Sequence, residues 1–320
     1  MALFPAAPET AHPVGGHCRS APSGSPVAVP IPSACEGPQD GGPGSSPTPS
    51  PDVSIVLATL NERDNLPTLF ERLFQLPLPR CEVIVVDSGS HDGTREFVVE
   101  RAASDPRIRL LRGAQGQALV GAQVQGIRSA AGPLVVVMDG DLQHPPSVVP
   151  EIVAALRDST ALAIASRYAP GGSVGGRGML RGLISRAAQL AAVSVIPEAR
   201  QVSDPLSGFF GFHRDCFDAS AADLRGYKLL LTLLVLCRDL GVAQIPYRFE
   251  ERRAGSSKIT RDPAFVPVFL SELFAVRRLA RHSRDSYPVL HSPPEGRSRP
   301  RLGGGPRAAA GPVGRRGAGP

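Results

Sequence analysis

A regular alternation of short apolar segments and amphipathic segments limits the folds that this 320-residue chain can adopt. The apolar, β-rich segments are residues 53–58, 82–87, 108–111, 134–139 and 161–166, and a segment with helical spacing follows each of the first four. Strand and helix thus alternate about every 25 residues, which predicts an α/β fold with a mostly parallel sheet flanked by helices. In such sheets, ligands bind beyond the carboxyl ends of the strands.

The two ends of the chain differ in composition from the middle. Residues 1–51 contain 12 Pro and 7 Gly, and residues 283–320 contain 7 Pro and 8 Gly. Segments so poor in bulky apolar residues bury too little surface to offset the entropy lost on ordering. We therefore predict a disordered leader at 1–51, a folded domain at 52–260 and a disordered basic tail at 283–320.

Residues 261–282, between the folded domain and the basic tail, have the pattern of an amphipathic basic helix. The apolar side chains are Phe265, Phe269, Leu270, Leu273, Phe274 and Leu279, and the cationic ones are Arg277, Arg278 and Arg281. Such a helix can lie in the headgroup plane of a membrane, and it can equally pack on the folded domain. For a second apolar run, Leu229–Leu236, a buried helix is favoured over a membrane contact.

Several classes of protein are excluded by what the sequence lacks. Its five cysteines form no CxxC pair and no Cys/His ligand spacing, which is typical of free thiols in a reducing compartment. The sequence predicts neither a signal peptide nor a transmembrane helix. It has no dinucleotide fingerprint, P-loop or nucleophile elbow. The net charge of +6 is concentrated in the basic tail, and without a nucleic-acid-binding motif we expect no nucleic-acid partner.

An acidic loop follows the fourth apolar segment directly. It reads Asp139-Gly140-Asp141-Leu142-Gln143-His144-Pro145-Pro146. Two carboxylates two residues apart at a strand end can face one divalent ion, and an amide can add a neutral oxygen. An all-oxygen set suits Mg²⁺ or Mn²⁺, with diphosphate oxygens in the open positions. His144 could act as a base or a ligand, but a role in packing the loop is favoured.

Seven short motifs follow one another between about residues 52 and 260. They are Thr59-Leu60-Asn61-Glu62, Val86-Asp87 to Thr94, Asp139 to Pro146, Ser166-Arg167-Tyr168 with Gly171-Gly172, Asp204 to Phe209, Gly226-Tyr227-Lys228 to Leu231, and Phe249 to Lys258. Together they resemble the family 2 glycosyltransferases of the GT-A (Rossmann-like) fold, and among these the dolichol- or polyprenol-phosphate mannosyltransferases. On this resemblance, residues 52–260 are the catalytic domain.

The resemblance implies a role for particular residues. It places the metal, Mg²⁺ or Mn²⁺, on Asp139, Asp141 and Gln143, where the ion neutralises charge on the departing nucleoside diphosphate. The implied donor-binding residues are Ala58, Leu60, Glu62, Asp87, Asp139, Gly140, Arg167, Arg252 and Lys258. Asp141, Arg181 and Ser185 are the implied catalytic residues. The last two stand one helical turn apart, where the family binds the phosphate of the lipid.

The implied reaction moves a sugar to a lipid phosphate. Mannose from GDP-mannose would be transferred to dolichyl or polyprenyl phosphate with inversion, giving a β-linked polyprenyl-phosphate sugar. The acceptor phosphate is already anionic at pH 7, so positioning and electrostatics would supply most of the reduction of the barrier. The implied partners are the nucleotide-sugar donor, the lipid acceptor, a membrane surface and, where the chain needs one, a separate membrane-anchor protein. The implied location is cytoplasmic, peripheral at the cytoplasmic face of the membrane.

Departures from the family pattern keep alternatives open. Leu60 stands where the family usually has Tyr, and Ala58 where it has Pro; because both would line the base pocket, a UDP-sugar such as UDP-glucose is an alternative donor. Ser88 replaces the second Asp of an Asp-Asp pair, which leaves open a non-catalytic relative that only binds nucleotide. Gly140 replaces Ala. A nucleotidyltransferase of similar fold is a further alternative. The Phe249–Lys258 motif argues against it.

Overall fold

The computed structural model describes residues 50–114, 118–158, 160–175, 179–217, 228–238, 240–250 and 265–286, with the backbone alone at 179–181, 265 and 282–286. All of these residues fall within one compact unit that begins at Pro49. In the described part, no helix is both long enough and apolar enough to cross a bilayer.

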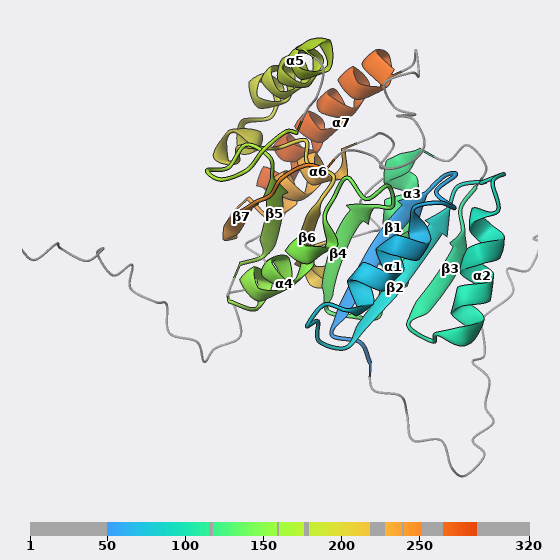
Figure 1. Cartoon of the computed structure of the whole chain (residues 1–320). Helices are drawn as coiled ribbons and strands as arrows, with labels where there is room; N and C mark the ends of the chain where they lie inside the picture. Colours follow the sequence, from blue (N-terminus) through green and yellow to red (C-terminus); the bar gives the residue numbers. More distant parts are fainter. Residues whose placement is uncertain are drawn as a thin grey trace, which may run out of the picture. The chain divides into compact units, whose positions relative to one another are not determined.

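A mixed sheet of seven strands forms the middle layer of the fold (Figure 1). The strands are β1 (Val53–Thr59), β2 (Cys81–Asp87), β3 (Ile108–Arg112), β4 (Leu134–Asp139), β5 (Leu162–Ser166), β6 (Phe210–His213) and β7 (Val242–Pro246). Their order across the sheet is β3-β2-β1-β4-β6-β5-β7. Only β6 runs antiparallel to its neighbours, β4 and β5. The predicted α/β fold with a mostly parallel sheet is therefore confirmed, together with the five predicted strands.

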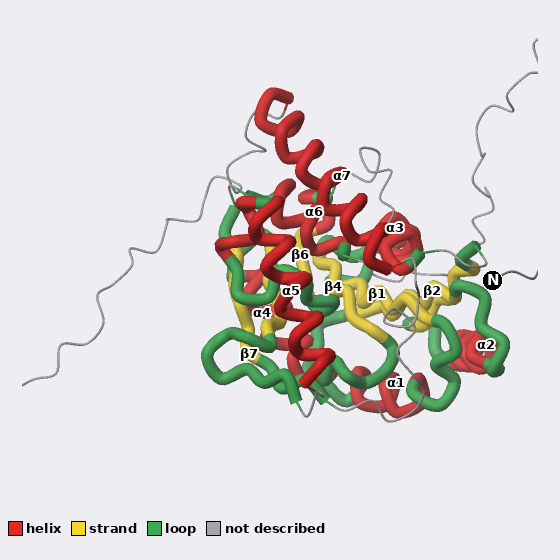
Figure 2. The backbone as a smooth tube through the Cα atoms, turned by 90° about the horizontal axis from the view of Figure 1, so that it is seen from above, coloured by secondary structure: helices red, strands yellow, loops and turns green. Residues whose placement is uncertain are grey.

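Helices cover both faces of the sheet. They are α1 (Leu66–Phe74), α2 (Thr94–Ser104), α3 (Leu119–Ser129), α4 (Val149–Arg157), α5 (Met179–Val195), α6 (Leu229–Leu236) and α7 (Phe265–Ser286), with short 3₁₀ turns at Pro146–Val148, Pro197–Gln201 and Arg214–Cys216. In the view along the layers, the strands lie between α1 and α2 on one side and α3, α6 and α7 on the other (Figure 2). The α/β/α sandwich buries the sheet on both faces, which is why its strands are nearly all apolar.

Each face of the sheet has its own hydrophobic core, because successive side chains of a strand point to opposite faces. On β1, Val56 belongs to the core under α3, α5, α6 and α7. Its neighbours Ile55 and Leu57 belong to the core under α1, α2 and α4. α1 shows the matching helical pattern, since it buries Leu66, Leu69, Phe70 and Leu73. The two cores together hold the strand ends in fixed relative positions.

Two apolar helices of the C-terminal part behave differently. α6 is apolar on every side and buries seven of its eight residues, which confirms the prediction of a buried helix at Leu229–Leu236. α7 buries Phe269, Leu273, Val276 and Ala280 but exposes Val266, Leu270 and Phe274. It continues to Ser286, four residues into the segment predicted as tail. Packing on the domain and an exposed apolar face thus coexist in one helix.

Candidate active site

The register of the central strands brings the predicted residues together at one edge of the sheet. Thr59, the last residue of β1, pairs with Asp87 at the end of β2. On its other side β1 pairs with β4, and Ala58 lies opposite Asp139. Because β6 is antiparallel, the segment that precedes Phe210 opens at this same edge, beside the end of β5. Four chain segments therefore converge on the carboxyl ends of β1, β2 and β4.

The acidic loop after β4 is held in a strained conformation by a buried leucine. Leu142 has a φ of +62°, a left-handed conformation that is costly for a bulky residue, and its side chain is buried in the core under α1 and α4. Asp141 is buried as well, and its Oδ1 accepts a hydrogen bond from the backbone N–H of Gln143 at 3.1 Å. Asp139 keeps 37% of its side chain exposed. The buried Leu142 thus fixes the course of the loop between Asp141 and Gln143.

His144 packs the loop through its ring. Its Nδ1 accepts the backbone N–H of Asp139 at 3.1 Å, so the proton of the ring lies on Nε2. The ring stacks on Phe209 at 5.1 Å and meets Tyr247 and Phe249 edge-on. Burial lowers the pKa of His144 to about 4, against the opposing charge of Asp141. These contacts match the predicted packing role.

The loop offers hard oxygen ligands to a cation. Within the described ranges, no three His, Cys, Asp or Glu side chains gather as a metal centre would require. The available set is the two carboxylates of Asp139 and Asp141 with the amide of Gln143, whose nitrogen donates to the Glu250 carbonyl at 3.5 Å and so leaves its oxygen for a cation. Mg²⁺ and Mn²⁺ are commonly bound by one or two carboxylates together with substrate phosphates. The residues therefore fit an ion that shares its coordination with a bound diphosphate.

The predicted donor side of the site is built from two loops that hold each other. Asp87 is fully buried; its carboxylate accepts hydrogen bonds from the Ser90 hydroxyl and backbone N–H, and from the Arg95 guanidinium at 2.9 Å. Asn61 has a φ of +53°, and its side chain accepts the backbone N–H of His91 at 2.8 Å. The loop after β1 is thereby locked to the loop after β2.

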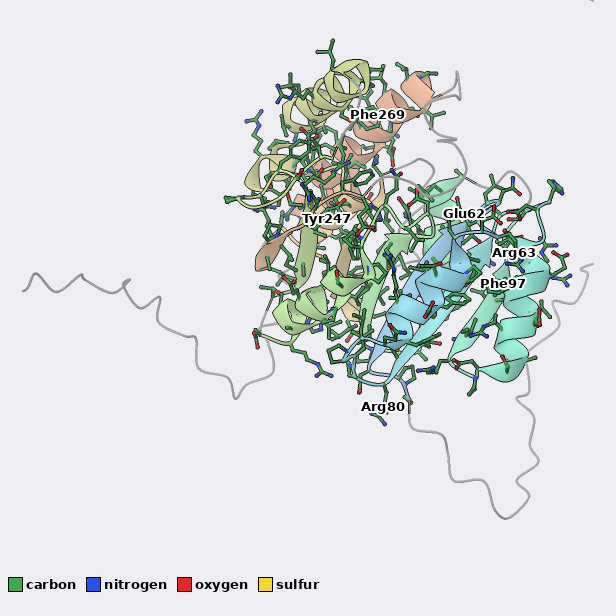
Figure 3. All side chains as sticks on the ribbon, in the orientation of Figure 1. Glu62, Arg63, Arg80, Phe97, Tyr247 and Phe269 are labelled. Carbon is green, nitrogen blue, oxygen red and sulfur yellow. The ribbon has the colours of Figure 1, made fainter. Side chains whose placement is uncertain are left out.

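The remaining predicted donor residues lie around this junction. Glu62 lies in the loop that follows β1 (Figure 3) and is buried. Its carboxylate accepts the Asn65 side-chain N–H at 2.7 Å. Ala58 and Leu60 are half-buried. A Cβ on Gly140 would meet Thr59 at 3.2 Å and Glu62 at 3.7 Å, so the metal loop and the loop after β1 lie in direct contact. Their contacts with a nucleotide stay a prediction.

Arg167 is committed to a partner that the sequence did not assign. Its Nε and Nη2 donate to the two oxygens of Asp204 at 2.6 and 2.7 Å, and Asp204 is fully buried. Burial opposes the charge of Arg167, but the hydrogen bonds and the charge of Asp204 outweigh it and raise its pKa. This bidentate pair joins the end of β5 to the segment before β6. The role of Arg167 at a phosphate stays a prediction, with its fork occupied in this structure.

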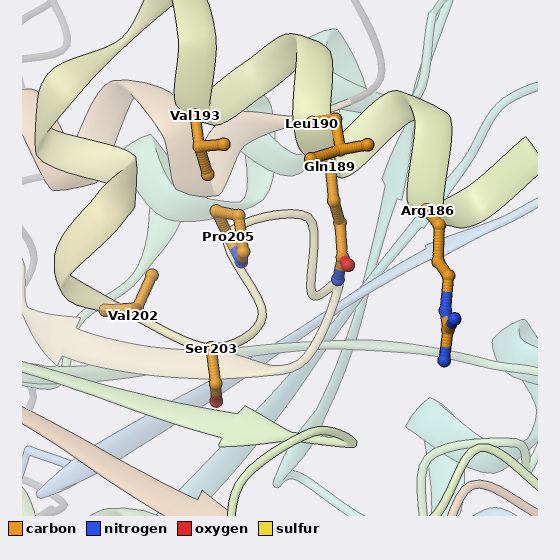
Figure 4. A pocket seen from close by; sticks show the side chains of 7 residues that line it. All are labelled: Arg186, Gln189, Leu190, Val193, Val202, Ser203 and Pro205. Carbon is orange, nitrogen blue, oxygen red and sulfur yellow. The ribbon is translucent and has the colours of Figure 1, made fainter.

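The residues predicted to bind the acceptor lie on α5. As predicted, Arg181 and Ser185 lie in one helix; Ser185 is half-buried, and the side chain of Arg181 lies outside the described part. One turn further along, a pocket of about 330 Å³ opens between α5 and the segment that leads to Asp204 (Figure 4). Its lining residues are Arg186, Gln189, Leu190, Val193, Val202, Ser203 and Pro205. It combines an apolar wall with one cation at its rim.

Two predicted donor residues, Arg252 and Lys258, lie outside the described residues. The described chain stops beside the metal loop, because the backbone N–H of Glu250 donates to the Gln143 carbonyl at 3.1 Å. Sequence reasoning missed the partners Asp204 and Arg95, and it also missed Lys228. Asp204 and Lys228 stand within quoted motifs, which was the available signal. Nothing in the sequence singled out Arg95.

Comparison with known proteins gives a consistent set of relatives. The family model for glycosyl transferase family 2 matches residues 54–219. A dolichol-phosphate mannosyltransferase of Pyrococcus furiosus is 35% identical over 65% of this chain, which spans 59% of that protein. A protein of the same name from Mycosarcoma maydis is 32% identical over 72% of this chain and 80% of its own length. The polyprenol monophosphomannose synthase of Mycolicibacterium smegmatis is 31% identical over 64% of this chain and 80% of its own.

Solved structures share the fold. The glucosyl-3-phosphoglycerate synthase of Mycobacterium tuberculosis, solved with Mn²⁺, UDP-glucose and phosphoglyceric acid, superposes with a TM-score of 0.55 and 22% identity. The match covers 71% of this chain and 80% of that one. At this identity the likeness concerns the arrangement of the sheet and its helices.

Proposed function

Because this chain belongs to glycosyl transferase family 2, we propose that it transfers a mannosyl group from a nucleotide-sugar donor to a polyprenyl or dolichyl phosphate. Relatives that carry the corresponding names are 31–35% identical to it. GDP-mannose is the donor that the resemblance favours. The family membership is shown by the match over 54–219; the donor, the acceptor and the residue roles below are our proposal.

One observation carries the proposal. The acidic loop, the two interlocked loops after β1 and β2, and the Arg167–Asp204 pair all reach the same edge of the sheet. A parallel sheet binds its ligand beyond this edge. Carboxylates for a cation therefore stand beside the place where a nucleotide would lie, and the Arg167–Asp204 pair lies at the end of β5.

The proposed cation, Mg²⁺ or Mn²⁺, would be held by Asp139, Asp141 and Gln143. When bound, it would supply charge neutralisation for the departing nucleoside diphosphate. The chain itself fixes the direction of these ligands through the buried, strained Leu142 and the packed His144. A rigid ligand set costs no reorganisation when charge develops, which is how electrostatic preorganisation lowers a barrier.

On the donor side, Asp87 and Glu62 would accept hydrogen bonds from the base or the ribose, and Ala58, Leu60 and Gly140 would shape the wall beside them. Arg252 and Lys258 would contact phosphate oxygens. The last described residue before them, Glu250, lies beside the metal loop, because its backbone N–H donates a hydrogen bond to the Gln143 carbonyl.

On the acceptor side, Arg181 and Ser185 would bind the lipid phosphate. A phosphate monoester is anionic at neutral pH, so the chain need not deprotonate it; it must place one phosphate oxygen in line with the anomeric carbon. Direct displacement there would invert the configuration and give a β-linked product. The apolar wall of the pocket along α5 supports a lipid-bearing acceptor on this side.

The exposed side of α7 supports contact with a membrane surface. Val266, Leu270 and Phe274 recur every four residues on one side of the helix, and Arg277, Arg278 and Arg281 follow them. This pattern suits a helix that lies in the headgroup region with its apolar stripe facing the lipid. We propose peripheral binding at the cytoplasmic face, with or without a separate anchor protein.

The test is a transfer assay. It combines the purified 320-residue protein with Mn²⁺, a polyprenyl phosphate and a panel of radiolabelled sugar nucleotides, and it measures label in the lipid phase. We expect label in the lipid phase with GDP-mannose. Label from a UDP-sugar alone would favour the alternative raised by Ala58 and Leu60. Nucleotide binding without transfer from any donor would favour a non-catalytic relative, and absence of both would overturn the proposal.

A further inference from the structure

Lys228 is one of only two lysines among the 35 basic residues of the chain, and it is anchored at the candidate active site from two sides. It directly precedes α6. Its Nζ donates to the Leu206 carbonyl at 3.0 Å, and its backbone N–H donates to Glu272 Oε1 of α7 at 2.8 Å. Glu272 is itself buried. Both the backbone and the ammonium of Lys228 are therefore fixed.

The anchor of the ammonium lies in the middle of a functional segment. Two residues before Leu206, Asp204 receives the fork of Arg167. Two residues after it, a Cβ on Gly208 would lie 3.4 Å from Oδ2 of Asp139. The ammonium of Lys228 is thus attached between the Arg167–Asp204 pair and the metal loop.

Among the described residues, Lys228 has no full counterion. Asp204 is already neutralised by Arg167, and among the described residues no carboxylate lies within ion-pair distance of Lys228 Nζ. Burial lowers the pKa of Lys228, the charge of Arg167 adds to this effect, and Asp139, Asp204 and Glu272 oppose it. Burying an ammonium without a paired anion costs free energy, because the charge loses its hydration. A bound anionic ligand would offset this cost, and such groups are therefore found at binding sites.

The ammonium also has unused hydrogen-bonding capacity. A lysine carries three N–H donors, and within the described ranges only one of them, the donor to Leu206, has a partner. Arg167 differs from it, because both ends of its fork are occupied by Asp204. Unlike Arg167 and Arg95, Lys228 therefore has donors that can reach an anion without first breaking an ion pair.

We propose that Lys228 is a further catalytic residue, whose ammonium binds a phosphate oxygen of the substrates beside Asp139. This inference rests on the proposed function. Lysine suits the task as a compact point charge that needs no planar fork on its partner. Arg167 then acts as a positioning residue, which holds Asp204 and with it the segment that anchors Lys228. The phosphate is that of the nucleoside diphosphate or that of the lipid acceptor, and the experiment separates the two.

The first measurement uses the wild-type protein. Because the chain has only two lysines, acetylation followed by mass spectrometry reports Lys228 and Lys258 separately. We expect a nucleoside diphosphate with Mn²⁺ to slow the acetylation of Lys228 at least fivefold. Protection by polyprenyl phosphate alone would assign the contact to the acceptor. Unchanged acetylation of Lys228 with either substrate, while transfer proceeds, would overturn the inference.

The second measurement uses Lys228→Met and Lys228→Arg. Losing one charged hydrogen bond should weaken nucleoside diphosphate binding in Lys228→Met roughly 10- to 100-fold by calorimetry, and Lys228→Arg should recover most of it. An unchanged affinity with a raised KM for the lipid assigns the acceptor phosphate instead. A lysine that only supports the fold would lower the thermal midpoint and leave both affinities unchanged. If the wild-type protein neither binds nucleotide nor transfers sugar, the proposed function itself fails. If the wild-type protein does both, and the two Lys228 variants do so equally well, this inference alone fails.

Discussion

Asp141 is buried while Asp139 stays partly open to solvent, although both belong to the same loop. Asp141→Asn keeps the size of the side chain and its acceptor for the Gln143 N–H, but it removes the charge. We expect turnover with Mn²⁺ to fall at least about 100-fold, with an unchanged circular dichroism spectrum. Asp158→Asn, at the exposed end of α4, is the matched control. Near-normal turnover in Asp141→Asn would refute the metal assignment.

The Arg167–Asp204 pair separates a supporting role from a phosphate-binding one. Arg167→Met leaves a fully buried carboxylate without its partner, so we expect unfolding to become easier by about 3–5 kcal/mol. Arg167→Met with Asp204→Leu removes both charges and should recover most of that loss. Urea unfolding of the two single variants and the double variant measures the coupling.

Transfer activity of the same double variant settles the role of Arg167 at the substrate. If Arg167 only holds the segment before β6, restored stability should bring back part of the activity. If it contacts a phosphate, as the family resemblance implies, activity should stay low in a stable protein. Wild-type stability in Arg167→Met would contradict the importance of the pair itself.

At the scale of the elements, Glu82 joins β1, β2, β3 and the end of α3 at the edge of the sheet opposite the site. Its carboxylate accepts the Ser54 hydroxyl at 2.6 Å, the Ala131 N–H at 2.7 Å and the Arg109 guanidinium at 2.7 Å. Burial alone would raise the pKa of Glu82, but these three donors together lower it below its ordinary value of 4.5. The charged form is therefore the one that stabilises the folded state.

The direction of this pKa shift fixes a pH dependence. The stability that Glu82 contributes is present above its unfolded-state pKa and is lost as the pH falls through its lower folded-state pKa. We expect Glu82→Gln to destabilise the protein by on the order of 1 kcal/mol at pH 7, a value reduced by the partial exposure of the pair with Arg109, and to lose less than wild type between pH 5 and 3. Urea unfolding across this range is the measurement, with the exposed Glu96→Gln as control. Parallel pH curves for Glu82→Gln and wild type would contradict it.

α7 has a buried apolar side, which contributes to folding, and an exposed apolar side, which we expect to bind the membrane. Removing residues 262–320 would take Phe269, Leu273 and Val276 out of the core, so truncation cannot isolate membrane binding from folding. Substituting Ser at Val266, Leu270 and Phe274 changes only the exposed stripe. We expect flotation with anionic vesicles to fall at least about tenfold while the thermal midpoint is kept.

The matched control for the stripe is Val99→Ser on α2, which is also exposed. It should float as wild type does. Equal flotation of the triple variant and the wild type would remove α7 from the membrane contact and leave its packing against α6 as its role. The same experiment at high salt separates the contribution of Arg277 and Arg278 from that of the apolar stripe.

At the scale of the whole molecule, the sequence predicted the α/β class and the first five strands, because buried parallel strands are almost purely apolar and hard to mistake. It missed β6 and β7. β6 is only four residues long and contains Gly211. The segment before it does not show the alternation of apolar and polar residues that predicts a strand. Both strands are defined by pairing with distant neighbours, which no local pattern encodes.

For the candidate site, the sequence predicted the positions of residues at strand ends but not the pairings of their side chains. Residues at strand ends, such as Asp87 and Asp139, could be placed because register follows from the fold class. Pairings such as Arg167 with Asp204 could not, since they depend on an antiparallel strand inserted far along the chain. The burial of Lys228 against α7 was likewise hidden, because it needs two helices to meet.

The strand order also has a consequence for how the protein is made. β6 lies between β4 and β5 in the sheet but leaves the ribosome after both. The edges of β4 and β5 that face β6 therefore lack their final partner until some forty-four further residues beyond β5 have been synthesised. Open edges invite pairing with other chains. We therefore expect that slowing translation just before Phe210 increases the aggregation of newly synthesised chains.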